Sequence, residues 1–136
     1  MVNYWLGKQE PNTYNISELE KEKKTVWDEV HNNLALKYMR QMKKGDLAFF
    51  YHTGNERQIM GIMEITSSPY PNPKEKDPRF VVVDVKFKKR LTRPVTLNEI
   101  KDNKKFEKWD LLRISRLSVM PVPSQIWDEI IKISQK

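Results

Sequence analysis

The sequence contains no cysteine, and only four glycines and two histidines occur among its 136 residues. The absence of cysteine excludes disulfides and thiolate metal sites. The two histidines, His31 and His52, do not have the spacing of a metal site, and the few glycines form neither type of phosphate-binding loop. A nucleophile elbow is missing too. The residues therefore predict no catalytic group, no metal and no cofactor.

Long apolar runs are also missing. No run approaches the roughly 20 residues of a membrane-spanning helix. Charged residues stand near the N-terminus, where a signal peptide needs an apolar segment. We therefore expect a soluble, cytoplasmic protein without a membrane partner.

Positive charge is abundant, with 25 Lys and Arg against 18 Asp and Glu and a formal net charge of +7. A basic surface attracts polyanions, so nucleic acid is a candidate partner. A composition rich in Lys and Glu without cysteine is equally typical of proteins from high growth temperatures. The length and the 10% aromatic content predict one packed domain over residues 1–136 and leave the oligomeric state open.

The segment Leu47–His52 is predicted to be the central strand. Lys43–Gly45 before it is typical of a helix end. Apolar side chains alternate on both faces of the strand, which indicates cover on each side. The strand leads into the hydrogen-bonding side chains of Tyr51, His52 and Thr53. A rigid strand that carries such groups to a rim is typical of a ligand pocket.

The other elements follow from periodicity, caps and turn residues. Strands are expected at residues 2–7, 58–65, 80–87 and 117–122, and a hairpin turn at 54–57. Gly61 indicates a β-bulge or a close backbone approach. The expected helices are residues 16–20 (capped by Asn15 or Ser17), about 33 to 45, 96–100 (with a Thr96–Glu99 capping box), a turn at 109–112, and 124–134 (capped by Ser124). Residues 27–32 and 67–78 are expected to be irregular.

These elements amount to five or six strands, with helices inserted after the first strand and at the end. Hairpin connections and outlying helices are typical of one mixed sheet that curls into a barrel. The predicted fold class is therefore α+β, a small mixed β pseudo-barrel with peripheral helices.

Aromatic and polar side chains gather at the predicted element ends. Aromatic faces can hold a flat heterocycle while amides, carboxylates or hydroxyls read its edge, and a base held in this way is unpaired or flipped from a duplex. Trp109 and Trp127, on apolar helical faces, are expected in the core. For Trp27, beside Asp28 and His31, both a core position and a ligand contact stay open.

The order of motifs resembles the EVE domain family, a branch of the PUA-like barrels. The matching motifs are Tyr4-Trp5-Leu6, Lys8 to Pro11, Trp27 to Asn32 with Ala35, Met42 to Leu47, Phe49 to Thr53, Gly61-Ile62, Glu64-Ile65, Tyr70-Pro71, Val83 to Phe87, Leu112-Arg113, Arg116 to Val119 and Pro121-Val122. Each motif alone is weak, but their common order is specific. The resemblance implies a PUA-like pseudo-barrel whose pocket accepts a modified nucleobase, such as a modified cytosine, in DNA or RNA.

The resemblance also implies the residues of the base-binding pocket. They are Trp27, Asp28, Val30, Asn32, Tyr51, His52, Thr53, Lys8, Glu10 and Ser118. By side-chain chemistry, Trp27 and Tyr51 would stack on the base. Asp28, Asn32 and Glu10 would read its edge, and Lys8 would meet a phosphate or hold Glu10. His52 would donate to a carbonyl or serve as a structural histidine, and Ser118 is expected to fix backbone. Glu29 stands where glycine is usual in the family.

A basic run follows the strand at residues 80–87. Its members Lys86, Lys88, Lys89, Arg90 and Arg93 would track a phosphate backbone or form the solvated end of a strand. The leading hypothesis is a non-catalytic nucleic-acid-binding module that reads a modified or unpaired base. The alternatives are a small hydrolase of modified nucleosides, as among related ASCH barrels, with Lys8 and Glu10 as an acid–base pair, and an accessory module that binds RNA.

Overall fold

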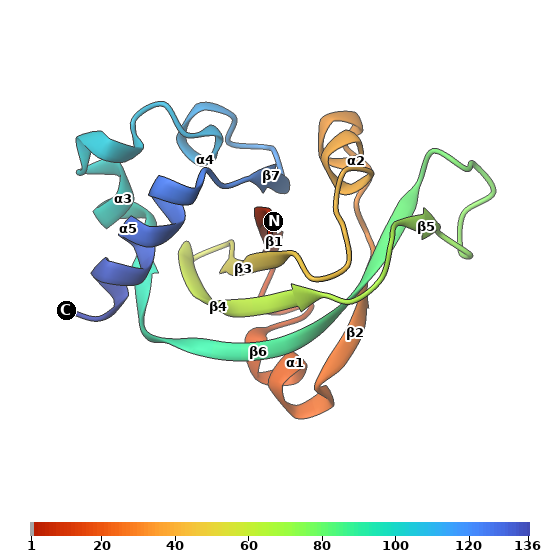
Figure 1. Cartoon of the computed structure of the whole chain (residues 1–136), viewed down its shortest axis with the longest axis horizontal. Coiled ribbons are helices and arrows are strands. Elements are labelled where there is room, and N and C mark those ends of the chain that lie inside the picture. Colours follow the sequence, from red (N-terminus) through yellow and green to blue (C-terminus); the bar gives the residue numbers. More distant parts are fainter. Residues whose placement is uncertain (1) are drawn as a thin grey trace.

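The computed structural model describes residues 2–136, and its strands form one curled sheet (Figure 1). The strand order is β2-β6-β4-β3-β1-β7, and the short β5 pairs with β6. The strands are β1 (Tyr4–Gln9), β2 (Lys24–Trp27), β3 (Leu47–His52), β4 (Gln58–Ile65), β5 (Tyr70–Pro71), β6 (Val81–Thr96) and β7 (Val119–Pro121). The helices are α1 (Ile16–Glu22), α2 (Asn33–Met39), α3 (Leu97–Lys101), α4 (Asp110–Arg113) and α5 (Ser124–Ser134), with a 3-10 turn at Lys104–Phe106.

The sheet is mixed, as the sequence predicts. β1 and β3 run parallel, with Tyr4 opposite Leu47 and Gln9 opposite His52, while the other pairs are antiparallel. Helices α3, α4 and α5 gather at one end of the curl in Figure 1, and α1 lies beside β2 and β6. The predicted α+β fold, a mixed pseudo-barrel with peripheral helices, is therefore confirmed. Among residues 2–136, no helix is both long and apolar enough to span a bilayer.

Several local predictions are confirmed because they rest on backbone chemistry. The central strand and its hairpin partner β4 have the expected bounds. Asn15 and Thr96 each close a capping box, with Glu18 and Glu99 respectively. At Gly61 the β4–β6 register shifts, and an added Cβ would lie 2.7 Å from a backbone oxygen of β6, so only glycine allows this approach.

Five local predictions are wrong. The strand expected at residues 80–87 is β6, which continues to Thr96. Trp27, expected to be irregular, ends the strand β2, which pairs with β6, and β5 adds a strand inside the segment 67–78, which the sequence predicts to be irregular. α2 ends at Met39 instead of Gly45, since the amides of Gln41 and Met42 close 3-10-type turns by donating to the carbonyls of Tyr38 and Met39. Ser124 is the first residue of α5 and not its cap, which is Pro123. Because β2 and β5 are not expected from the sequence, the seven strands within residues 2–136 exceed the predicted five or six.

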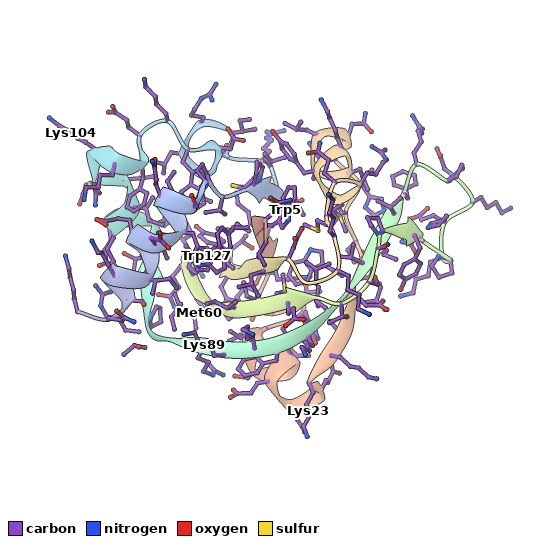
Figure 2. All side chains as sticks on the ribbon, viewed as in Figure 1. Trp5, Lys23, Met60, Lys89, Lys104 and Trp127 are labelled. Carbon is purple, nitrogen blue, oxygen red and sulfur yellow. The ribbon has the colours of Figure 1, made fainter. Side chains whose placement is uncertain are left out.

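The core is built on stacked aromatic rings. Trp127 of α5 lies between Tyr4 and Phe49, with ring centroids 4.4 and 3.8 Å away. Figure 2 shows Trp5 and Trp127 inside the molecule, whereas the lysines labelled at its periphery point outward. Five of the six β3 side chains are buried, which confirms that β3 is covered on both faces. β3 is thus a rigid support for whatever lies at its end.

Candidate base-binding cavity

A cavity of about 290 Å³ lies at the ends of β1 and β3. The parallel register sets Lys8 beside Tyr51, and the Thr53 amide donates to the Gln9 carbonyl over 2.8 Å, so both strands end at one edge. Segments from α3 and α4 close the other side. We call this the rim cavity. It is lined by Lys8, Tyr51, Thr53, Gly54, Arg57, Leu97, Lys101, Leu111 and Ser115.

Lys8 is fixed in the cavity by its backbone and by its side chain. Its amide donates to the Ser118 carbonyl over 2.8 Å, and its Nζ donates to the Ser115 carbonyl over 3.0 Å. Nζ also lies 5.8 Å from the ring centroid of Tyr51, in cation–π range. Burial lowers the pKa of the Lys8 amine, because the charged form loses water.

Tyr51 forms the aromatic wall. It is 3% exposed, so a small part of its surface faces the cavity, whereas the rest packs in the core. Burial raises the pKa of its phenol to about 12, against the opposing charge of Arg57. The hydroxyl is therefore neutral at physiological pH and can donate as well as accept.

The rim cavity is cationic. Lys8, Arg57 and Lys101 line it, and none of the three forms an ion pair with a carboxylate within residues 2–136. The Glu10 carboxylate lies against Gly54 at the rim and accepts from the Asn12 amide over 3.0 Å. Three cations around an aromatic wall suit an anionic, aromatic ligand.

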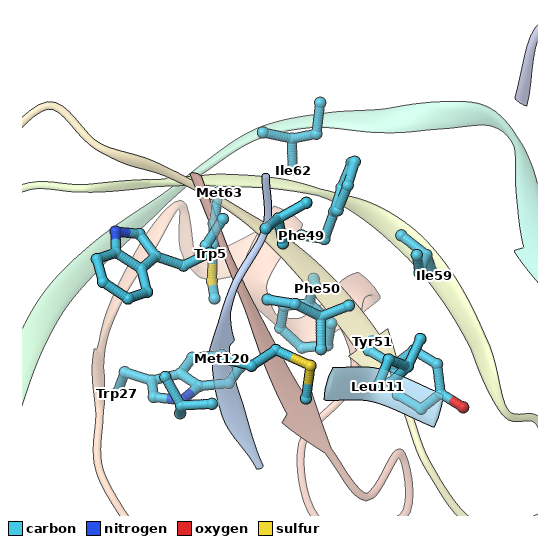
Figure 3. Packing of buried hydrophobic residues seen from close by; sticks show 14 of the residues in the cluster. Trp5, Trp27, Phe49, Phe50, Tyr51, Ile59, Ile62, Met63, Leu111 and Met120 are labelled. Atoms are coloured by element: carbon cyan, nitrogen blue, oxygen red, sulfur yellow. The ribbon is translucent and has the colours of Figure 1, made fainter. Parts of the chain in front are cut away.

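Trp27 lies in the core and does not line the rim cavity. It is 2% exposed, its ring meets Phe50 edge-on at 5.4 Å, and an added Cβ at Gly7 would lie 2.7 Å from it. Figure 3 shows Phe50 between Trp27 and Tyr51. The predicted sandwich of one base between Trp27 and Tyr51 is therefore not formed, because the two rings lie on opposite sides of the sheet.

The residues that follow Trp27 in the sequence make contacts within the protein. The Asp28 carboxylate accepts from Lys74 Nζ over 3.3 Å. Val30 is buried, and the Asn32 side chain caps α2 by accepting from the Ala35 amide. The structure thus does not bring Asp28, Val30 or Asn32 into the rim cavity.

His52 takes the structural role that the sequence left open. It is 3% exposed. The Ile16 amide at the start of α1 donates to its Nε2 over 3.1 Å, so Nδ1 carries the proton and donates to Glu56 over 2.9 Å. Both ring nitrogens are therefore used within the protein. Ser118 contributes its carbonyl to Lys8, in line with its expected backbone role.

The basic run lies along β6, and acids offset most of its charge. Lys86 and Lys88 both approach Glu64, at 3.9 and 3.7 Å. Arg90 binds Glu20 at 2.8 Å and the Ser17 hydroxyl at 2.7 Å. Arg93 holds Glu99 through two hydrogen bonds. Only Lys89, labelled in Figure 2, lacks such a partner within residues 2–136.

Comparison with known proteins identifies the family. The model of the EVE domain matches residues 3–133. This chain is a member of the EVE domain family. Thymocyte nuclear protein 1 of Mus musculus is 32% identical, with 99% of this chain and 75% of the relative covered.

Solved structures share the EVE domain fold. The human THYN1 protein, crystallised in complex with 5-methylcytosine-containing DNA, matches with a TM-score of 0.91 and 28% identity over 98% of each chain. An ASCH protein from Zymomonas mobilis matches with a TM-score of 0.61 at 6% identity over 96% of this chain and 95% of its own, so it shares the fold alone.

Sequence reasoning missed six of the nine residues that line this EVE domain's rim cavity. Gly54 and Arg57 lie in the connection between β3 and β4, Leu97 and Lys101 belong to α3, and Leu111 and Ser115 come from the α4 segment. Nothing in their local sequence sets them apart from surface lysines or core leucines. Within residues 2–136, no group of three or more His, Asp or Glu side chains could hold a metal ion.

Proposed function

We propose that this EVE domain is a non-catalytic nucleic-acid-binding module that holds a modified or unpaired base in the rim cavity. A modified cytosine is the first candidate. The observation that carries the proposal is the Tyr51 wall with the cations of Lys8, Arg57 and Lys101 around it. Aromatic side chains give bases a stacking surface, and cations attract phosphates. The human THYN1 protein in complex with 5-methylcytosine-containing DNA supports this ligand class.

The size of the cavity limits what enters it. Its volume of about 290 Å³ is at the lower end of small-molecule pockets, which span ~300–1,000 Å³. One base fits, and the phosphates then lie outside, where Arg57 and Lys101 are exposed. The Thr53 hydroxyl donates to the Gln9 carbonyl over 3.2 Å and can still accept from an exocyclic amine of the base.

The test is fluorescence anisotropy with single-stranded oligonucleotides that carry either one central 5-methylcytosine or cytosine, as DNA and as RNA. Tyr51→Ala should weaken binding of the modified strand roughly 5- to 150-fold, since a stacked base is worth about 1–3 kcal/mol. Tyr51→Phe should keep most of the affinity. Tyr38→Ala, which truncates a half-buried ring outside the cavity, is the control for loss of a tyrosine ring. Because Tyr51 is itself buried, circular dichroism of Tyr51→Ala checks that this variant is folded.

Exposed residues give a second readout that does not depend on the fold. Arg57→Ala and Lys101→Ala should each reduce the slope of log affinity against log salt by about 1. Lys44→Ala, at an exposed turn, should leave the slope unchanged. Equal affinity and slope in all of these variants and wild type would remove the rim cavity from the binding site.

One observation favours a second candidate, hydrolysis of a modified nucleoside. Burial lowers the pKa of Lys8, which raises the fraction of neutral amine available as a base. Glu10 lies at the same rim, against Gly54. Incubation with N4-acetylcytidine, followed by chromatography, should then give cytidine with wild type and none with Lys8→Ala. Absence of product with wild type would exclude this activity for that substrate.

Three narrower expectations stay predictions. RNA binding is checked by the RNA arm of the anisotropy experiment. A cytoplasmic location is checked by fractionating cells that express the chain. The behaviour of residues 1–136 as one domain is checked by coincidence of fluorescence and circular dichroism unfolding curves.

A further inference from the structure

The edge of the sheet at β2 leaves backbone groups without a strand partner. The Phe87 amide of β6 donates to the Lys23 carbonyl over 2.8 Å, which makes Lys23 and Phe87 a hydrogen-bonded pair. In an antiparallel ladder every second pair is hydrogen-bonded, so the next bonded residues of β2 are Thr25 and Trp27. The amides and carbonyls of Lys24 and Val26 then face away from β6. β2 is the last strand in the order, and within residues 2–136 nothing pairs with these groups.

A groove of about 620 Å³ lies beside this edge. It is lined by Lys24, Thr25, Val26, Thr66, Asp84 and Lys86. Val26 is 42% exposed, which is unusual for a strand valine next to a packed core. The groove therefore combines an apolar floor with the open strand edge.

The groove belongs to a sheet face that a helix covers elsewhere. Leu47, Glu64, Lys86 and Lys24 are successive cross-strand neighbours, so they share one face. Phe49, two residues from Leu47 on that face, lies under Trp127 of α5 at 3.8 Å. The groove itself is lined only by residues outside the described helices.

The charges of the groove favour an anionic occupant. Lys24 and Lys86 are direct cross-strand neighbours, where like charges repel. Lys86 shares Glu64 with Lys88, and Lys24 has no ion pair within residues 2–136. The Asp84 carboxylate is engaged by the Tyr70 hydroxyl at 2.6 Å.

We propose that β2 and its groove bind an extended acidic peptide segment of a partner protein, which adds to the sheet as a further strand. The peptide backbone pairs with Lys24 and Val26, an apolar side chain covers Val26, and carboxylates meet Lys24 and Lys86. A nucleic-acid strand lacks the alternating amides and carbonyls that this edge accommodates. A second copy would bring another lysine-rich β2 to the same edge, which repulsion opposes.

Amide exchange on the ¹⁵N-labelled full chain tests the proposal. The probe is an acetylated and amidated octapeptide of sequence Thr-Glu-Thr-Val-Thr-Glu-Thr-Val, in which Glu and Val stand two positions apart and share one face, as Lys24 and Val26 do. The control peptide has proline in place of the Val and Thr at its centre. At saturation, exchange of the Lys24 and Val26 amides should slow at least about tenfold. The Thr25 and Trp27 amides, already bonded to β6, are internal controls and should not change. The control peptide should not slow exchange of the Lys24 and Val26 amides.

Variants separate strand addition from simple charge attraction. Val26→Pro removes an outward amide without breaking a β2–β6 bond and should abolish peptide binding. Lys24→Glu should weaken it at least about fivefold, while Lys44→Glu, at an exposed turn, should match wild type. Tyr51→Ala should bind the peptide normally, which keeps this test independent of the rim cavity.

Several results would overturn the proposal. These are no saturable binding at millimolar peptide, equal protection by the proline peptide, or equal binding by Val26→Pro. Displacement of the peptide by a single-stranded oligonucleotide whose own affinity falls in Val26→Pro would assign the groove to nucleic acid. A concentration-dependent dimer by sedimentation that Val26→Pro abolishes would assign it to a second copy.

Discussion

The side chain of Asp46 joins the start of β3 to the start of β1. It is 2% exposed. Its Oδ1 accepts from the Asn3 amide at 3.1 Å, and its Oδ2 accepts from Trp5 Nε1 at 3.0 Å and from the Lys43 amide at 2.9 Å. The two parallel strands β1 and β3 carry the rim cavity at one end, and this one carboxylate anchors both of them at the other end.

Replacing Asp46 by alanine should cost about 3 kcal/mol of unfolding free energy. Bonds to a charged group contribute about 1.5–3 kcal/mol each, and an orphaned buried donor costs about 1–3 kcal/mol. Water can replace the carboxylate at Asn3 and Lys43, whose residues are exposed, but not at the buried indole of Trp5. Asp46→Asn should cost about 1–2 kcal/mol, because its amide oxygen can serve Trp5 and Lys43 while its NH₂ faces the Asn3 amide.

Urea unfolding followed by tryptophan fluorescence measures these costs. With a typical slope of about 1–3 kcal/mol/M, Asp46→Ala should lower the midpoint by roughly 1–3 M. Trp5→Phe removes the indole donor and keeps most of the ring packing, so the double variant isolates the Trp5–Asp46 pair. A coupling energy below about 0.5 kcal/mol, or equal midpoints for Asp46→Ala and wild type, would refute this reasoning.

Three further outcomes are expected. Glu29 has φ +66°, a left-handed conformation that costs a residue with a side chain about 1–2 kcal/mol. Glu29→Gly removes this strain but adds the entropic cost of glycine in the unfolded chain, so the free energy of unfolding should stay equal or rise by up to about 1 kcal/mol. A clear loss of stability in urea unfolding would contradict this. The side-chain hydrogen bond from Arg93 lowers the pKa of Glu99 from 4.5 to about 2. The stability advantage of wild type over Glu99→Gln should therefore be complete above pH 4.5 and fall away between pH 4.5 and about 2 in acid titrations, and an advantage independent of pH would count against the ion pair. His52→Leu orphans the Ile16 amide and should cost about 1–3 kcal/mol, with faster hydrogen exchange at Ile16; unchanged exchange there would show that this bond does not hold α1.

Features set by a few neighbouring residues could be predicted from the sequence. Asn15 with Glu18 and Thr96 with Glu99 fix helix starts, because a capping box needs only two side chains three residues apart. The alternation in Leu47–His52 indicates a strand that is buried on both faces. The order of the motifs along the chain, from Tyr4-Trp5-Leu6 to Pro121-Val122, resembles the EVE domain family without any knowledge of tertiary contacts.

Only the tertiary structure decided where the candidate site lies. Trp27 has the same local sequence whether it faces a ligand or the core. Pairing of β2 with β6 sets it against Phe50 and Gly7. The rim cavity joins Lys8 to Lys101 and Ser115, and such distant residues meet only after the sheet curls and α3 and α4 pack on it. Burial and charge at these positions depend on long-range packing, which local sequence does not encode.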